Sequence, residues 1–183
     1  MADKQLDGVR VAILVTDGFE QVEMVKPRKA LDNAGAVTKL VSPKDDRVRG
    51  WNHHDQADSF RVDVPLAEAQ PEEFDALLLP GGVVNPDALR IDGKAVAFVR
   101  SFIDAAKPIA AICHGPWALV EAEGVKGHQM TSWPSLHTDL KNAGADWVDE
   151  PVVVDDGLVT SRRPDDIPYF NDEMVKLFAS AAH

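Results

Sequence analysis

The sequence contains a single cysteine, Cys113, and the next residue is His114. The pair follows an apolar run at residues 108–112 and precedes Gly115 and Pro116. A thiol beside an imidazole can attack a carbonyl carbon while the imidazole moves the proton. A lone cysteine is on base rates more often a buried core residue. Its position between an apolar run and a helical one favours a reactive thiol here.

The run at 108–112 is typical of a buried strand, and residues 116–122 have the pattern of a helix. In open α/β sheets, ligands bind at the carboxyl ends of the strands, so a residue at this corner faces a site. The start of a helix adds partial positive charge and free N–H groups. These lower the pKa of a thiol and can hold an oxyanion. We therefore predict a thiol that ionises near neutral pH.

Carboxylates and glycines follow two other predicted strands. Glu20 comes after the first strand, near a helix start, where it either faces the site or stabilises the helix dipole. Glu23 lies one turn further on and suits the dipole role better. Gly81 and Gly82 end the third strand, where glycines let backbone amides approach a ligand or simply make a tight turn. Asp87 either begins a helix or orients a histidine.

Short apolar runs alternate with longer amphipathic runs along the chain, which predicts a parallel sheet with helices on both faces. Two segments depart from this order and suggest hairpins, one around residues 60–64 and one at 152–160. Pro27 stands inside the first helical run, where it predicts a kink or a late helix start. The predicted strands are 9–15, 37–41, 75–79 and 108–112, and the predicted helices are 21–34, 94–106, 116–122 and 165–182.

The length and net charge of the chain limit the classes of function that it can have. The chain has 183 residues, a net charge of −11 and 45% hydrophobic residues, which predicts one domain over residues 1–183. The acidic balance argues against nucleic acid and anionic membranes as partners. The first residues lack the shape of a signal peptide, and no apolar run is long enough for a membrane helix. We therefore expect a cytoplasmic protein.

The sequence predicts neither a metal nor a cofactor. One cysteine excludes a disulfide framework, and the adjacent His53 and His54 have no third ligand spaced nearby. Trp117, one turn after the cysteine, is the tryptophan best placed to shape substrate access. Arg162 and Arg163 either bind an anionic substrate or pair with the acids that follow them.

Several motifs occur in an order that strongly resembles the ThiJ/PfpI superfamily, within the class I glutamine amidotransferase-like fold. The sequence looks closest to the branch of the PfpI intracellular protease and general stress proteins. The resemblance covers nearly the whole chain. The matching segments are DGFE at 17–20, FDALLLPGG at 74–82, AICHGP at 111–116, and further stretches at 141–145, 147–149, 152–155, 160–162 and 164–168.

This resemblance implies an α/β fold, a flavodoxin-like three-layer sandwich with a mainly parallel sheet and a nucleophile elbow. Cys113 would be the nucleophile and His114 the general base. Glu20 would hydrogen-bond the sulfur, and the amides of Gly82 and His114 would form an oxyanion pocket. In this branch an acid completes a triad with the histidine across a subunit interface. Asp87 takes that position here, where the branch has Glu, and its loop looks one residue longer.

The function that the resemblance implies is a stress-related, cysteine-dependent hydrolase of the peptidase type. One alternative is a glyoxalase or deglycase that acts on carbonyl adducts of the methylglyoxal kind. Another is a non-catalytic redox sensor or holdase, in which the thiol is oxidised. The expected partners are a small carbonyl or peptide substrate and further copies of the chain, as a homodimer or a dimer-built hexamer with the site near a subunit interface.

Overall fold

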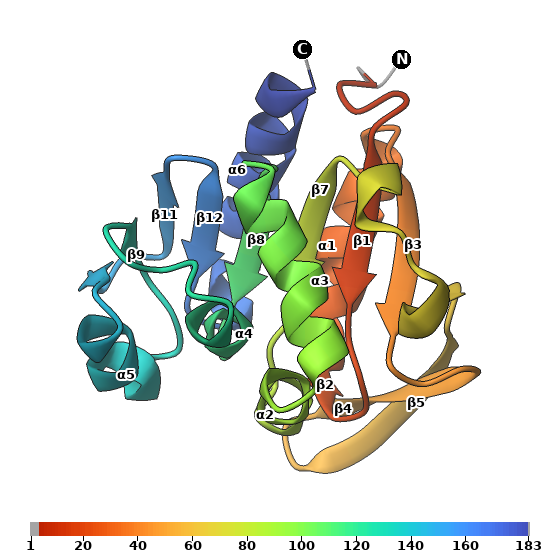
Figure 1. The fold of residues 1–183 in the computed structure, drawn as a ribbon, viewed down its shortest axis with the longest axis horizontal. Helices are drawn as coiled ribbons and strands as arrows, with labels where there is room; N and C mark the ends of the chain where they lie inside the picture. Colours follow the sequence, from red (N-terminus) through yellow and green to blue (C-terminus); the bar gives the residue numbers. More distant parts are fainter. Residues whose placement is uncertain (1–3, 183) are drawn as a thin grey trace.

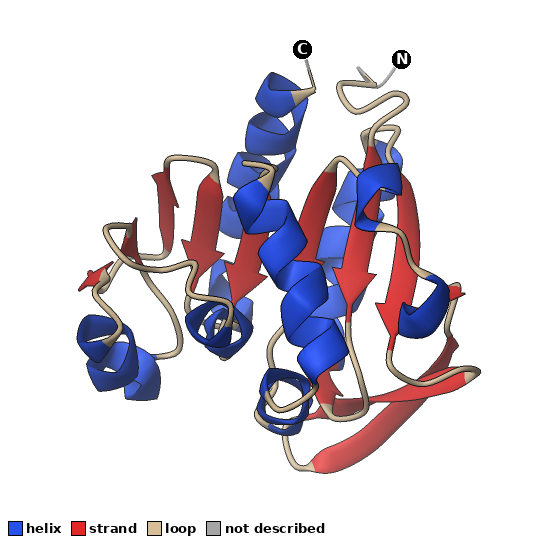
Figure 2. Ribbon diagram, viewed as in Figure 1, coloured by secondary structure: helices blue, strands red, loops and turns tan. Residues whose placement is uncertain are grey.

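The computed structural model describes residues 4–182. Its centre is a seven-stranded sheet in the order β11-β12-β8-β7-β1-β3-β6 (Figure 2). Neighbouring strands are parallel except for β11, which is antiparallel to β12. The mainly parallel sheet predicted from the sequence is thereby confirmed. The strands are β1 (Arg10–Leu14), β3 (Val37–Ser42), β6 (Val64–Pro65), β7 (Ala76–Leu79), β8 (Ile109–Ile112), β11 (Val152–Asp155) and β12 (Leu158–Ser161).

Helices cover both faces of this sheet (Figure 1). One face packs against α1 (Gln21–Asn33) and α6 (Ile167–Ala181). The other packs against α3 (Gly93–Asp104) and shorter helices. These are α2 (Val84–Arg90), α4 (Pro116–Glu121) and α5 (His137–Asn142), and single 3-10 turns occur at Leu66–Glu68, Pro71–Glu73, Pro134–Leu136 and Pro164–Asp166.

The two faces explain why the central strands are continuously apolar. Successive side chains of a strand point to opposite faces. In β7, Leu77 and Leu79 therefore join the core under α3, while Ala76 and Leu78 join the core under α1 and α6. Each residue of β7 is buried, because a helical layer covers each side.

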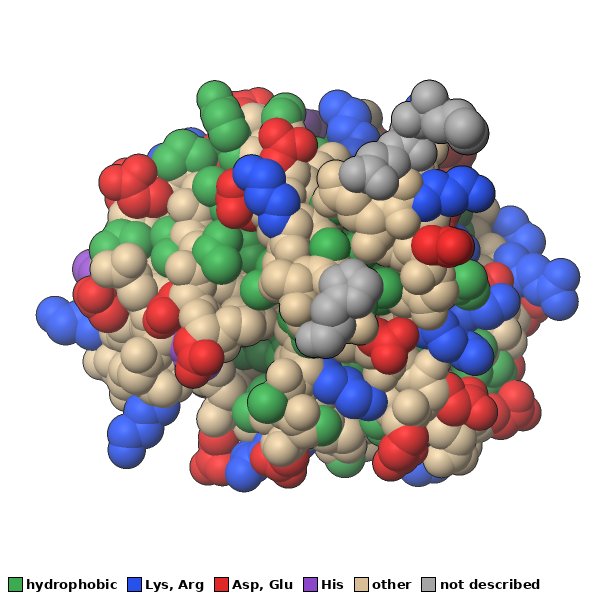
Figure 3. All heavy atoms as spheres, turned by 90° about the horizontal axis from the view of Figure 1, so that it is seen from above, with side chains coloured by type: hydrophobic (Ala, Val, Ile, Leu, Met, Phe, Trp, Pro, Cys, Tyr) green, Lys and Arg blue, Asp and Glu red, His purple; other side chains and the backbone are tan. Residues whose placement is uncertain are grey.

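The carboxyl ends of the parallel strands meet at one edge of the sheet, at the bottom of Figure 1. A small sheet lies across this edge, formed by β2 (Phe19–Glu20), β4 (Arg47–Asn52) and β5 (Asp55–Arg61). A second small sheet pairs β9 (Gln129–Met130) with β10 (Asp146–Trp147). The first and last described residues lie at the opposite edge, over which charged side chains of both signs are spread (Figure 3).

Three local differences from the sequence prediction concern this edge. The hairpin runs from Arg47 to Arg61, whereas Val64, predicted as part of it, belongs to β6 of the central sheet. A two-residue strand, β2, precedes α1, and a short helix, α2, follows the Pro-Gly-Gly turn. The first helix runs through Pro27. In the described part of the chain, no helix combines the length and the apolar character needed to cross a membrane.

Close packing at the turn after β8 leads to a stability prediction. A Cβ on Gly115 would collide with the carbonyl oxygen of Leu79 and lie 3.0 Å from that of Ile112. Because backbone atoms cannot move aside, Gly115→Ala should destabilise the protein by about 2–3 kcal/mol in urea denaturation. Gly93→Ala, where a Cβ meets nothing within 4 Å, is the matched control. Equal stability of the two variants would contradict the prediction.

Candidate active site

Cys113 occupies a sharp elbow between β8 and α4. Its φ of +62° is in the left-handed region, which is unfavourable for any residue with a Cβ. Two hydrogen bonds hold this conformation: its N–H donates to the carbonyl of Ser161 at 3.0 Å, and its carbonyl accepts from the N–H of Trp133 at 2.9 Å. Strand β12 and the loop after β9 therefore fix the direction in which the sulfur points.

The sulfur of Cys113 is nearly buried and lies among polar groups. The residue is 7% exposed, and its Sγ lies 3.2 Å from Nδ1 of His114. The backbone N–H groups of Gly82 and His114 also face the sulfur and favour its charged form. Burial and the nearby Glu23 carboxyl outweigh them, so the pKa of the thiol is raised above its usual value. The prediction of a low thiol pKa was therefore wrong for the site without substrate.

The carboxyl group beside the sulfur belongs to Glu23. This residue lies in the first turn of α1 and is completely buried. Burial, and then the negative charge of Glu20, raise its pKa to about 8, although the thiol and the amides of Gly81 and Gly82 act in the opposite direction. Neither carboxyl oxygen makes a hydrogen bond of standard geometry within the described residues. Glu23 is therefore largely neutral at pH 7.

The expectation that Glu20 approaches the sulfur was wrong. Glu20 pairs with Trp51 in the register of β2 and β4, so its side chain belongs to the hairpin side of the pocket. Both of its carboxyl oxygens lie 3.2 Å from the N–H of His53 at the hairpin tip. Glu20 ends β2 directly before α1, whereas Glu23 lies in the first turn of α1 on its buried face, which reaches the sulfur.

Glu20 contacts the hairpin tip, and its negative charge acts on the buried carboxyl of Glu23. A second prediction follows from this arrangement. Glu20→Gln keeps an acceptor for the amide of His53 but removes a negative charge near Glu23. The pKa of Glu23 should therefore fall below about 8, which carbon-13 NMR of its carboxyl carbon would measure. Asp58→Asn, which removes an exposed charge from the same hairpin, is the control. An unchanged Glu23 titration in Glu20→Gln would contradict this link.

His114 is held between two tryptophan rings. Its ring is stacked near Trp133, with centroids 6.0 Å apart, and meets Trp117 edge-on at 5.1 Å. Burial lowers the pKa of His114 to about 4, so the imidazole is neutral at pH 7. A neutral imidazole has one nitrogen free to accept a proton. In the tautomer that carries its proton on Nε2, Nδ1 faces the Cys113 thiol as an acceptor at 3.2 Å.

Asp87 and Trp117 are the two other predicted site residues. Asp87 is exposed in the first turn of α2, and within the described residues it makes no hydrogen bond to His114. The helix directs this carboxyl to solvent, so the single chain does not form a triad. Trp117 supports the ring of His114 and donates a hydrogen bond to Asp139, but it does not line the pocket. Trp133 lines it instead.

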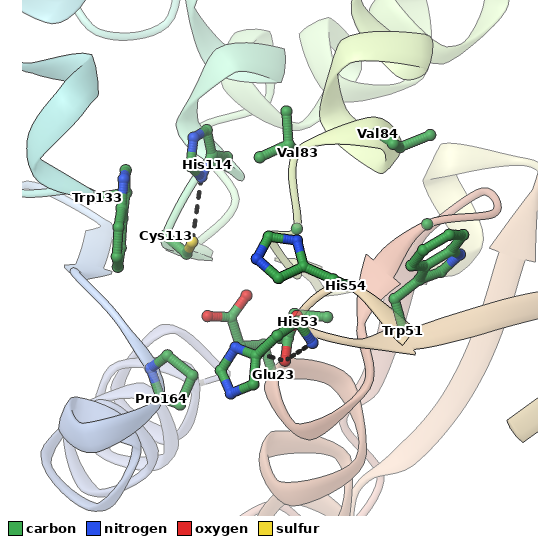
Figure 4. Close-up of a pocket in the computed structure, with 13 residues that line it drawn as sticks. Glu23, Trp51, His53, His54, Val83, Val84, Cys113, His114, Trp133 and Pro164 are labelled. Carbon is green, nitrogen blue, oxygen red and sulfur yellow. Dashed lines mark hydrogen bonds and ion pairs between the residues drawn. The ribbon is translucent and has the colours of Figure 1, made fainter. Parts of the chain in front are cut away.

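The elbow opens into a pocket of about 460 Å³. Figure 4 shows Cys113, His114 and Trp133 on one side and the hairpin residues Trp51 and His54 across from them. Sequence reasoning had not assigned a pocket role to Trp51, Trp133 or His54, which come from loops and a strand distant in the chain. The lining residues are Gly18, Glu20, Glu23, Trp51, His53, His54, Gly82, Val83, Val84, Cys113, His114, Trp133 and Pro164.

The structure also bears on a possible metal site and on the roles of Arg162 and Arg163. Among residues 4–182, no three His, Cys, Asp or Glu side chains are grouped so that they could hold a metal ion. Arg162 pairs with Asp166 and Asp149, each at 2.9 Å, and so has the structural role that the sequence left open. Arg163 instead lies over the ring of Trp133, with 5.8 Å between its Cζ and the ring centroid.

The fold and the cysteine elbow define a class of α/β proteins, and comparison with known proteins gives the family. The chain belongs to the DJ-1/PfpI family, whose model matches residues 9–177. It is 44% identical over 169 residues to an uncharacterized protein of Staphylococcus epidermidis, covering 91% of this chain and 96% of that protein. It is 42% identical over 173 residues to protein/nucleic acid deglycase 2 of Escherichia coli K12, covering 93% and 98%.

A solved structure supports the same assignment. A two-domain protein of Anabaena variabilis, with DJ-1/ThiJ/PfpI-like and ferritin-like domains, matches with a TM-score of 0.86 and 34% identity. The match covers 92% of this chain and 47% of that one, so the chain spans about half of the two-domain protein. The flavodoxin-like sandwich implied by the sequence resemblance is confirmed.

Proposed function

We propose that this protein is a cysteine-dependent hydrolase that acts on small carbonyl adducts, such as those that methylglyoxal forms with amines. The observation that carries the proposal is the thiol of Cys113, exposed to a pocket of about 460 Å³ and placed 3.2 Å from Nδ1 of His114. A pocket of this size admits a small adduct. The 42% identity to a protein named as a deglycase supports this substrate class.

The reaction begins at the adduct carbon that carries both the amine and a hydroxyl group. His114 takes the proton of the Cys113 thiol, and the sulfur forms a bond to that carbon while the carbon–nitrogen bond breaks. The amine leaves with the proton. The result is a hemithioacetal on Cys113, in which the neighbouring ketone of the methylglyoxal unit is intact. A neutral His114 suits both halves of this transfer, because it accepts and then returns a proton.

The hemithioacetal then rearranges and is hydrolysed. A proton moves from its carbon to the adjacent carbonyl carbon through a base, so that a lactoyl thioester forms without an external oxidant. Water cleaves the thioester, which releases lactate and restores the thiol. The amides of Gly82 and His114 stand where negative charge develops near the sulfur-bound carbon, which is how an oxyanion pocket lowers a barrier.

Glu23 suits this chemistry because it is neutral. A charged carboxylate beside the sulfur would oppose a thiolate by like-charge repulsion. With its pKa raised to about 8, Glu23 instead retains its proton beside the sulfur at pH 7. The site therefore holds one negative charge at a time as the thiol reacts, and titration of the two groups is coupled.

A peptidase function rests on a less complete site. It requires an acid that orients His114, and Asp87 of the same chain is exposed and does not contact this histidine. A second copy of the chain would have to supply the acid in a homodimer or a dimer-built hexamer. The carbonyl-adduct reaction needs no such partner, and for that reason we favour it over the peptidase.

One comparison separates the candidate functions. Wild type, Cys113→Ala and Asp87→Asn are assayed against the methylglyoxal adduct of Nα-acetyl-lysine, a peptide panel and an aggregating client protein. Release of lactate that is lost in Cys113→Ala but kept in Asp87→Asn supports the proposal. Peptide cleavage lost in both variants would overturn it in favour of the peptidase. Client protection that survives Cys113→Ala, without lactate release by wild type, would favour a holdase.

A further inference from the structure

We propose that Asn85 is a positioning residue, which holds the peptide group between Gly81 and Gly82 so that its N–H points at the reacting centre. Asn85 lies in the first turn of α2, shortly after the Pro-Gly-Gly turn, and is completely buried. It does not line the thiol pocket, so it acts on the site only through the backbone. Its effect on turnover rests on the proposed function, whereas its hold on the peptide group does not.

The side chain of Asn85 is hydrogen-bonded to the backbone of two loops. Its Oδ1 accepts from the N–H of Thr16 at 2.8 Å, in the loop after β1. Its Nδ2 donates to the carbonyl oxygens of Pro80 at 3.2 Å and of Gly81 at 3.1 Å. These partners determine the orientation of the side-chain amide, because a backbone N–H only donates and a carbonyl only accepts. The buried amide therefore ties the loop after β1 to the turn after β7.

The hydrogen bond to the Gly81 carbonyl determines where the N–H of Gly82 points. The two groups belong to one planar peptide unit, and in a trans peptide they point in opposite directions. The same carbonyl also accepts from the N–H of Glu20 at 3.4 Å. With its carbonyl held by these donors, the peptide unit presents its N–H to the sulfur of Cys113 on the other side.

A turn of two glycines needs such an external hold. Glycine restricts backbone rotation less than any other residue, so a peptide unit between two glycines turns over easily. Neither glycine has room for a side chain: a Cβ on Gly81 would lie 2.7 Å from Cβ of Cys113, and one on Gly82 would collide with the carbonyl oxygen of Gly18. The restraint therefore has to come from outside the turn, and Asn85 supplies it from α2.

The second peptide unit at the sulfur is held in the same way. The carbonyl of Cys113 accepts from the N–H of Trp133 at 2.9 Å, and the N–H of that peptide unit is the one of His114 that faces the sulfur. Both donors of the proposed oxyanion pocket are thus fixed by hydrogen bonds at their carbonyl ends. Donors that are oriented before the reaction lower its barrier, because they need no rearrangement as negative charge develops. For Gly82, that orientation comes from Asn85.

The first test measures the hold on the peptide unit without substrate, through the pH dependence of Cys113 alkylation by iodoacetamide. Asn85→Ala removes both N–H donors and adds no charge. The thiolate then loses the hydrogen bond from Gly82, and the pH midpoint of alkylation should rise by about half a pH unit or more. A merely structural role has the opposite sign: a loosened site exposes the thiol, whose pKa burial has raised, and the midpoint falls.

Thr38→Val is the matched control for the loss of a buried polar group. It removes a hydroxyl that bonds Asp32 at 2.7 Å and Arg28 at 3.1 Å, where β3 packs on α1, and it touches neither peptide unit. Its alkylation midpoint should stay at the wild-type value. Asn85→Ser keeps a hydroxyl for one of the three partners and is measured alongside, in case the alanine variant does not fold. An unchanged or lowered midpoint in the Asn85 variants would overturn the proposal.

The second test connects the peptide unit to turnover. Asn85→Ala should lower kcat for lactate release from the methylglyoxal adduct by about tenfold or more per alkylatable thiol, with KM within about twofold of wild type. KM is spared because the side chain does not line the pocket. Thr38→Val should keep the wild-type kcat. An unchanged kcat in Asn85→Ala would overturn the role in turnover. Absence of lactate release from wild type, together with a raised alkylation midpoint in Asn85→Ala, would contradict the proposed function and support the hold on the Gly82 N–H.

Discussion

Cys113→Ala should lower the turnover of the methylglyoxal–lysine adduct by about a thousandfold or more, because no other group can form the covalent intermediate. Cys113 is the one cysteine of the chain, and its sulfur is the atom that faces His114 and the two backbone amides. Loss of the nucleophile removes the covalent step, while the pocket remains. Lactate release under saturating substrate is the measurement.

This loss must be separated from unfolding. The alanine keeps the backbone position at φ +62° and removes only one sulfur atom, so urea denaturation should show a change of about 1 kcal/mol or less. Cys113→Ser keeps a hydroxyl at the same place and should also be nearly inactive, since the hydroxyl is a much weaker nucleophile without strong activation. Retention of more than about a tenth of the activity in a folded Cys113→Ala protein would contradict the assigned nucleophile.

Glu23→Gln should stabilise the protein at alkaline pH by several kcal/mol and change little at pH 5. The folded-state pKa of Glu23 is raised to about 8 from an ordinary value of 4.5. The folded protein therefore holds a proton that the unfolded chain releases, and stability is lost as pH rises through the window between these two values. Glutamine has a similar shape without a charge, so it avoids this loss. The full window corresponds to a change of about 5 kcal/mol.

The measurement is the free energy of unfolding of both proteins at pH 5, 7 and 9. The difference between Glu23→Gln and wild type should grow from pH 5 to pH 8 and then level off. Glu68→Gln, at an exposed carboxyl outside the site, is the matched control. A difference that is the same at all three pH values would mean that Glu23 is ionised throughout, contrary to its burial.

The reactive elbow was predictable because its signal is local. An apolar run that ends in Cys113 and His114, followed by Gly115 and Pro116, specifies a strand, a tight turn and a helix start within a few residues. The two helical layers that cover the sheet were predictable for a similar reason, because each central strand is apolar on both faces. The family resemblance added the approach of the Gly82 amide, which lies some thirty residues away in the sequence and faces the sulfur.

The remaining site residues depend on placement that the sequence pattern does not specify. Glu20 and Glu23 both fit a carboxyl near a helix start, and the structure decides between them because Glu20 belongs to β2 and Glu23 to the buried face of α1. Trp133 reaches the pocket from a loop without periodicity, through its hydrogen bond to the carbonyl of Cys113. Asp87 matched a motif position, but the orientation of α2 turns it outward.

Carbon-13 NMR during turnover tests the central claim most directly, that the thiol of Cys113 adds to the substrate carbonyl carbon. Methylglyoxal labelled at its aldehyde carbon is mixed with wild type and with Cys113→Ala. The account predicts a protein-bound resonance of a tetrahedral carbon bonded to sulfur, which appears only with Cys113 present and decays as labelled lactate forms. Lactate formation by Cys113→Ala at the wild-type rate, with no such resonance in wild type, would contradict it.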